Sequence, residues 1–218
     1  MAPMLAAAAL AALLSTAAPT TPDADEAPPC FDVALVARVA KQKPGPFPDD
    51  PVFEFTWSRP WRLDLDVEQV LIGGEAPGRL PVTATLSSKL NPHSKHALFF
   101  LKRRTDGGYD STGMIMTTIV SDARGRFVKP VEDPLREHML YPNGWVPASY
   151  EQLLRPIRYR AADAWWLQPP RIEEDVLDEL DPAWVRRDGR GAVARRGLFV
   201  DDWMRALKAQ PGAVCPHD

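Results

Sequence analysis

Strict alternation of apolar and charged residues predicts one β-strand with particular clarity. The segment Trp61–Ile72 reads WRLDLDVEQVLI, and its first four apolar residues alternate with Arg, Asp, Asp and Glu. Because successive side chains of a strand point to opposite faces, this segment should bury one face and expose the other to water. Gly73 and Gly74 follow directly and favour a turn at its end.

Strand patterns recur between residues 31 and 131. Phe31–Lys41 places apolar, often β-branched side chains at alternate positions, and His96–Arg103 (HALFFLKR) contains a continuous apolar run. Three further segments have strand character: Leu80–Leu86, Met114–Ser121 and Gly125–Val131. Strands at this spacing, with turns and little helical periodicity between them, predict a mainly β fold. We expect a small antiparallel OB-like barrel of five to six strands.

The periodicity becomes helical after about residue 147. Ser149 begins a capping box ahead of YEQLL, although Pro156 must interrupt that helix. Two further helices are expected over residues 171–180 (RIEEDVLDEL) and over Phe199–Ala209, whose apolar residues fall on one face. Short helices rarely stand alone, so this C-terminal α-helical extension should pack on the barrel.

The N-terminus has the pattern of a secretory signal peptide. An uncharged apolar stretch is followed by small residues, with Ser15 and Ala17 placed for cleavage after Ala17. The stretch is short for a membrane span, which needs about 20 residues. Residues 18–29 (APTTPDADEAPP) are typical of a disordered tether. The expected layout is a signal peptide at 1–17, a tether at 18–29, the barrel at 30–147 and the helical extension at 148–218.

The chain contains two cysteines, Cys30 and Cys215, at opposite ends of the expected folded part. Export to the periplasm or the exterior makes a disulfide between them the expected state, with two free thiols as the alternative.

Composition and charge narrow the class of protein. The 23 proline residues argue against a helical bundle. The formal charge of −3 comes from Asp23, Asp25 and Glu26, because Cys30–Asp218 carries equal numbers of acidic and basic residues. The chain as a whole therefore has no positive field that would attract nucleic acid.

The order of strand motifs resembles a known family. DVALVARV, LDVEQVLIGG, PVTATL and ALFFLKR before DGGY follow one another as in the tissue inhibitor of metalloproteinases and netrin-like group of OB-fold domains. The resemblance covers about residues 30–131 and implies the barrel. In the inhibitors a cysteine at the mature N-terminus chelates the target's zinc. Cys30 would lie inside the mature chain, so the resemblance does not imply inhibition.

Aromatic and arginine residues gather in residues 43–61 (KPGPFPDDPVFEFTWSRPW), between the first two predicted strands. In an OB-type barrel this loop lies beside the ligand face, where rings and guanidinium groups can stack on sugars, peptides or bases. The candidate ligand-binding residues are Trp57, Arg59, Trp61 and Arg62. Alternatively, Phe53, Phe55 and Trp57 form a strand whose aromatic face closes the core.

Two polar groups have competing interpretations. Asp64, Asp66 and Glu68 share one strand face and could divide acid and base roles, but a wet strand face with cross-strand ion pairs has the same pattern. His93 and His96 could share a metal, although a zinc site needs three or four ligands and loop histidines are commonly solvated.

Basic residues cluster at Lys102–Arg104 and from Arg186 to Arg196, where they could contact anionic envelope polymers or form a solvated surface. Trp165 and Trp166 could bind a ligand or pack the extension on the barrel. Common nucleophile, zinc-protease and phosphate-loop motifs are absent from the sequence.

The sequence therefore favours an exported, non-enzymatic binding protein for a protein or envelope polymer. We expect no cofactor, no metal, no nucleic acid and no membrane span in the mature chain. The alternative is an envelope hydrolase with a dispersed carboxylate site.

Overall fold

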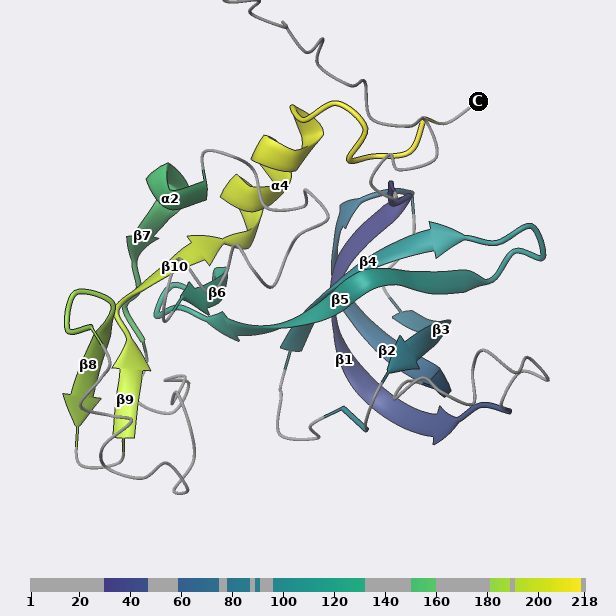
Figure 1. The fold of residues 1–218 in the computed structure, drawn as a ribbon, viewed down its shortest axis with the longest axis horizontal. Coiled ribbons are helices and arrows are strands. Elements are labelled where there is room, and N and C mark those ends of the chain that lie inside the picture. The colour runs from purple at the N-terminus through teal and green to yellow at the C-terminus, as the bar shows by residue number, and fades with distance from the viewer. Residues whose placement is uncertain are drawn as a thin grey trace, which may run out of the picture.

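The computed structural model describes residues 30–46, 59–74, 78–86, 89–90, 96–131, 150–159, 181–188 and 191–216. Its larger part is a closed barrel of five strands (Figure 1). The strands are β1 (Val33–Pro44), β2 (Arg59–Ile72), β3 (Gly78–Leu86), β4 (His96–Arg103) and β5 (Tyr109–Ser121).

The barrel closes through a single parallel contact. Antiparallel pairing runs from β3 through β2, β1 and β4 to β5, and Thr83 of β3 then pairs in parallel with Asp110 of β5. This arrangement confirms the predicted small OB-like barrel; its pairing is antiparallel as predicted except at the β3–β5 contact.

The seam between β3 and β5 is fastened by Arg104, in the turn between β4 and β5. Its guanidinium donates to Thr83 Oγ1 at 3.1 Å and lies 3.2 Å from a carboxylate oxygen of Asp110. It also forms a two-point contact with Asp106, whose pKa is lowered first by a hydrogen bond from the backbone N–H of Gly108 and then by Arg104. The β4–β5 hairpin is thereby held against β3.

The alternating pattern of β2 is confirmed. Its inward residues fill the barrel interior together with those of the other strands, while its charged residues lie on the outer face. The buried residues of β2 are Trp61, Leu63, Leu65, Val67 and Ile72.

The unbroken apolar runs of β1 and β4 have a different cause, because both of their faces are covered. Val33 and Leu35 of β1 point into the barrel, whereas Ala34 and Val36 belong to a second core cluster outside it. In β4, Phe99 lies inside the barrel and Phe100 outside. A strand covered on both faces has no wet side and so loses its alternation.

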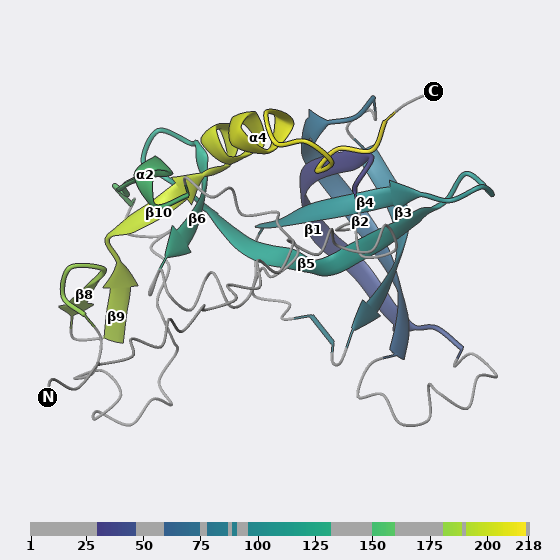
Figure 2. The same ribbon diagram turned by 45° about the horizontal axis from the view of Figure 1, so that its top comes forward.

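The outer cluster is covered by α4 (Val200–Lys208), which crosses the top of the molecule in Figure 2. This helix lies within the predicted Phe199–Ala209. Its buried residues are Val200, Trp203, Met204 and Leu207. Trp203 is fully buried and meets Phe100 of β4 at a centroid distance of 5.9 Å. The C-terminal helix is therefore packed on the barrel, as expected.

A second group of strands extends the sheet beyond the barrel. β5 continues to pair with β6 (Phe127–Val131), which is followed across the sheet by β10 (Arg196–Phe199) and β7 (Leu154–Pro156). Gly197 of β10 sits where a Cβ atom would collide with the carbonyl oxygen of Lys129. The close approach of β10 to β6 therefore requires glycine.

The C-terminal region is less helical than the sequence pattern suggested. The predicted YEQLL helix is a single turn, α2 (Tyr150–Leu153), and the chain becomes extended before Pro156. β8 (Val185–Asp188) and β9 (Gly191–Ala194) form a hairpin at the lower left of Figure 1. The helix expected over residues 171–180 lies outside the described residues. Within the described ranges, no helix is long and apolar enough to cross a membrane.

The predicted disulfide is confirmed. Cys30 and Cys215 are bonded, with Cα atoms 4.9 Å apart across a sequence separation of 185. Beside the bond, Phe31 N–H donates to the Ala213 carbonyl at 3.1 Å and Cys215 N–H donates to the Phe31 carbonyl at 2.9 Å. The two ends of the folded chain are thus joined covalently and through the backbone.

The turn between β5 and β6 is organised by Asp122, which is 2% exposed. One carboxylate oxygen accepts from the backbone N–H groups of Arg124 and Arg126, and the other accepts from the Arg126 guanidinium at 2.7 and 3.0 Å. Burial acts to raise the pKa of Asp122, but these hydrogen bonds outweigh it and the pKa is lowered.

We expect Asp122→Asn to lower the free energy of unfolding by about 2 kcal/mol at pH 7, because hydrogen bonds to a charged group are lost. A depressed pKa in the folded protein means that this stabilisation is present above the unfolded pKa of about 3.9 and is lost as the pH falls through the folded pKa. Urea unfolding of both proteins at pH 7 and pH 3 should therefore show the difference shrinking at low pH.

Asp64→Asn is the matched control, because Asp64 is partly exposed and makes no ion pair within the described part of the chain. It should change the free energy of unfolding by less than about 0.5 kcal/mol. A pH-independent loss in Asp122→Asn would contradict the assigned role of the carboxylate.

Candidate functional site

Strand register brings five polar residues into one row across the outer face of the barrel. Lys43 lies opposite Arg62, Arg62 opposite Thr83, Thr83 opposite Asp110, and Asp110 opposite Lys102. Directly opposed residues share a face of the sheet. We call this line the outer row. It crosses all five strands of the barrel.

The outer row carries more positive than negative charge. Lys43, Arg62 and Lys102 are exposed, and none of them forms an ion pair with another described residue. Asp110 is engaged by Arg104, which neutralises it. Lys41 lies on the same outer surface, directly opposite Asp64 of β2. The row therefore offers cations that are available to a ligand.

The predicted ligand-binding residues divide between this face and the core. Arg62 belongs to the outer row. Arg59 is partly exposed and its guanidinium lies 4.7 Å from the ring centroid of Trp61. Trp61 itself is 4% exposed and packs in the barrel interior, so its ring presents almost no surface to a ligand. Trp57, like Phe53 and Phe55, lies outside the described residues.

The indole nitrogen of Trp61 is an unusual feature of this end of the barrel. It is buried and finds no hydrogen-bond acceptor among the residues that the structure describes. Buried donors without partners are uncommon in folded proteins. Trp61 pairs with Pro44, directly after Lys43, so its backbone lies at one end of the outer row while its ring packs in the barrel interior.

Two of the three carboxylates on the wet face of β2, Asp66 and Glu68, are engaged in ion pairs. Asp66 accepts from two nitrogens of Arg79 on β3, at 2.8 and 3.1 Å. Arg79 lies directly opposite Asp66, and the pair is cross-strand as expected. Because both groups are substantially exposed, the pair contributes at most about 1 kcal/mol.

Glu68 is held from two sides by β1 and β4. One of its carboxylate oxygens lies 2.8 Å from Arg38 Nε and the other lies 2.6 Å from His96 Nδ1. The imidazole and the carboxylate are therefore in close contact. The His96 ring also packs against Phe127, at a centroid distance of 5.2 Å.

The histidine pair gives no metal centre in the part of the chain that is described. His93 lies outside it, and His96 is engaged by Glu68. Among the described residues, no three His, Cys, Asp or Glu side chains gather closely enough to hold a metal ion.

The remaining basic residues differ in their environments. Lys102 belongs to the outer row, Arg103 lies 5.8 Å from the ring centroid of Tyr109, and Arg104 fastens the barrel seam. Arg186 is exposed, and Arg196 stacks on Trp184 at 5.4 Å. Trp165 and Trp166 lie outside the described residues.

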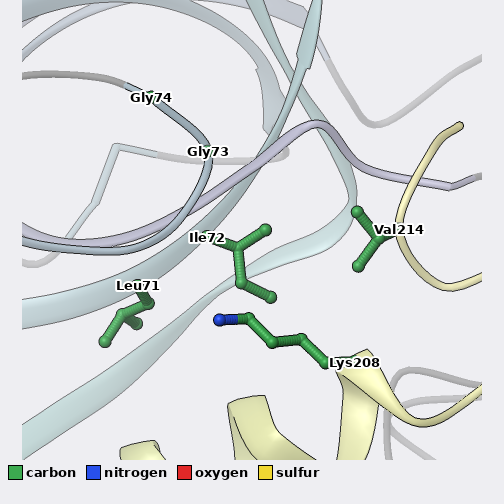
Figure 3. Close-up of a pocket in the computed structure, with 6 residues that line it drawn as sticks. All are labelled: Leu71, Ile72, Gly73, Gly74, Lys208 and Val214. Atoms are coloured by element: carbon green, nitrogen blue, oxygen red, sulfur yellow. The ribbon is translucent and has the colours of Figure 1, made fainter. Parts of the chain in front are cut away.

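A hollow that no sequence pattern predicted lies between the end of β2 and the end of α4 (Figure 3). Its volume is about 560 Å³, and its lining is mainly apolar with a single charged side chain. The lining residues are Leu71, Ile72, Gly73, Gly74, Lys208 and Val214. Residues from three separated segments meet here, and periodicity carries no signal for such a meeting.

Comparisons with known proteins do not identify the family of this chain. No family model, curated protein or solved structure matches the chain. The resemblance of residues 30–131 to the metalloproteinase-inhibitor and netrin-like group therefore stays a prediction from strand patterns, and the function has to be argued from the surface of the barrel.

Proposed function

We propose that this chain is an exported, non-enzymatic binding protein whose ligand carries closely spaced anionic groups, as an acidic protein segment or an anionic envelope polymer does. The ligand binds across the outer row of the barrel. The signal-peptide pattern and the Cys30–Cys215 disulfide support export, because disulfides persist in oxidising compartments.

The observation that carries the proposal is a set of exposed cations on the outer surface of an OB-like barrel, Lys43, Arg62 and Lys102, none of which forms an ion pair with another described residue. OB-folds bind extended ligands on the face of strands 2 and 3 and in the loops beside it. Arg62 lies on β2, opposite Thr83 of β3. The loop that contains Trp57 joins β1 to β2, so it begins and ends next to this face.

The alternative of a hydrolase has less support. Asp66 and Glu68 are each tied to cations on different neighbouring strands, which keeps them from acting together on one substrate. General acid and base groups need to converge in a concave site. The hollow beside α4 is lined by none of the three carboxylates.

We expect the double substitution Lys43→Glu and Arg62→Glu to weaken binding of poly-L-glutamate by about tenfold or more, which corresponds to about 1.4 kcal/mol. At these two adjacent positions, repulsion replaces the attraction between the protein and the carboxylates of poly-L-glutamate. Binding to the unaltered protein should also weaken with added salt, because exposed charges are screened. Calorimetric titration at two salt concentrations measures both effects.

A second double variant, Arg124→Glu with Arg158→Glu, makes the same change of charge on the second group of strands. Both side chains are exposed. Arg124 lies in the turn between β5 and β6, and the backbone carbonyl of Arg158 accepts a hydrogen bond from Ala123 N–H in the same turn. This variant should bind within about twofold of the unaltered protein, a difference of about 0.4 kcal/mol. Equal losses in the two double variants would show that only total charge matters and would refute the outer row as the site.

A further inference from the structure

The hollow beside α4 combines an apolar floor with one cation. Ile72 is 7% exposed, and Leu71 and Val214 are partly buried on the same core cluster. Figure 3 shows the side chain of Lys208 extending along Ile72, with its nitrogen toward Leu71. A lysine can lay its aliphatic stem on apolar surface while its ammonium stays available for a charged partner.

The ammonium of Lys208 has no carboxylate partner in the described part of the chain. It forms no ion pair with any residue of the described ranges, in contrast to Arg205 one turn earlier, whose guanidinium lies 2.7 Å from Asp202. The carbonyls of the last turn of α4 accept hydrogen bonds from Ala209 and Gln210, which reduces their competition for the ammonium. The described residues therefore leave the Lys208 ammonium available to an anion from outside the chain.

Both walls of the hollow are held by residues 30–33, at and just before the start of β1. On one side, Gly73 has a φ of 100° and approaches so closely that an added Cβ would lie 2.9 Å from a Val33 methyl group. On the other side, Val214 bridges to Phe31 and precedes Cys215, which is bonded to Cys30. A hollow whose walls are already held in place loses little conformational entropy when it binds a ligand.

We propose that this hollow is a binding site for an aliphatic carboxylate. The hydrocarbon chain lies on Leu71, Ile72 and Val214, and the carboxylate is held by Lys208. The volume falls within the range of about 300–1,000 Å³ that is common for small-molecule sites, which are mostly apolar with a few placed polar groups. The site is separate from the outer row and does not depend on the function proposed for that row.

The test is calorimetric titration of the oxidised protein with hexanoate, octanoate and decanoate below their micellar concentrations. Affinity should rise by up to about fourfold for each additional methylene that is buried. Amide resonances of Gly73 and Gly74 should shift on titration with octanoate. 1-Octanol, which has a similar chain without the charge, should bind at least about fivefold more weakly than octanoate because it gains no ion pair.

Two variants separate the parts of the site. Lys208→Met keeps a flexible apolar stem and removes the charge, and it should weaken octanoate binding at least about fivefold while leaving 1-octanol unchanged. Gly74→Phe should abolish binding of both ligands by filling the hollow, and should fold normally because a Cβ at Gly74 meets nothing within 4 Å. Lys102→Met is the control for loss of a lysine elsewhere and should bind octanoate as the unaltered protein does.

Three results would overturn the proposal. One is the absence of saturable binding or of shifts at Gly73 and Gly74. Another is undiminished octanoate affinity in Lys208→Met, which would mean that the lysine only covers apolar surface. The third is binding of an apolar peptide through its C-terminal carboxylate without binding of octanoate, which would assign the hollow to peptide ends instead.

Discussion

Loss of the disulfide should produce the largest fall in stability of any change considered. We expect the double substitution Cys30→Ser and Cys215→Ser to lower the free energy of unfolding by up to about 5 kcal/mol, since the bond restricts a very long loop in the unfolded chain. The loop spans a sequence separation of 185, which is most of the folded chain. Urea unfolding of the oxidised protein and of the variant measures the difference directly.

Reduction of the unaltered protein provides the matched comparison, because it breaks the same bond without changing any residue. It should reproduce the loss seen in the variant. The backbone hydrogen bonds between Phe31 and the segment Ala213–Cys215 should still hold the C-terminus in the folded state. An unfolding midpoint that does not change after complete reduction would contradict the role assigned to the bond.

Trp203→Ala should have the next largest effect, with a fall of about 3–5 kcal/mol in the free energy of unfolding. The side chain is fully buried between α4 and the outer face of β4, where it meets the ring of Phe100. Phe100 in turn meets Phe31 at a centroid distance of 4.8 Å. Removing the indole leaves a cavity at the junction of three segments, and thermal or urea unfolding measures the cost.

Arg205→Ala is the control on the same helix. Arg205 is mostly exposed, and its pair with Asp202 is a surface contact, so the change should cost less than about 1 kcal/mol. Similar losses in the two variants would mean that α4 contributes through helix formation alone, and would contradict its packing on the barrel.

The barrel could be predicted because each of its strands has a pattern that its own environment imposes. The bounds of β4 coincide with the predicted His96–Arg103, and β2 begins only two residues before the predicted Trp61. The sequence pattern of β4 does not indicate which part of the chain covers its outer face. That surface comes from α4, about a hundred residues later in the chain.

The short strands of the C-terminal region had no comparable signal. β7 has three residues, and β8, β9 and β10 have four residues each. Alternation over so few positions cannot be distinguished from chance. β10 is set by its neighbours β6 and β7 and by the close approach at Gly197, which are contacts between distant segments.

The candidate sites were predictable only in part. Arg62 could be proposed from its place after the aromatic loop, but its association with Lys43, Thr83 and Lys102 depends on register across the strands. Trp61 fitted both an exposed platform and a buried strand residue, and its burial follows from the alternation of β2. The hollow at Lys208 combines three segments, so neither spacing nor composition could indicate it.

The most direct test of the outer row as a ligand site is a measurement of lysine reactivity. Acylation of the oxidised protein, followed by mass spectrometry, gives the rate at each lysine with and without saturating poly-L-glutamate. We expect slower reaction at Lys41, Lys43 and Lys102, which lie on the outer surface of the barrel, and unchanged reaction at Lys208, which lies beside the hollow. Equal protection at every lysine, or no protection at Lys43, would contradict this expectation.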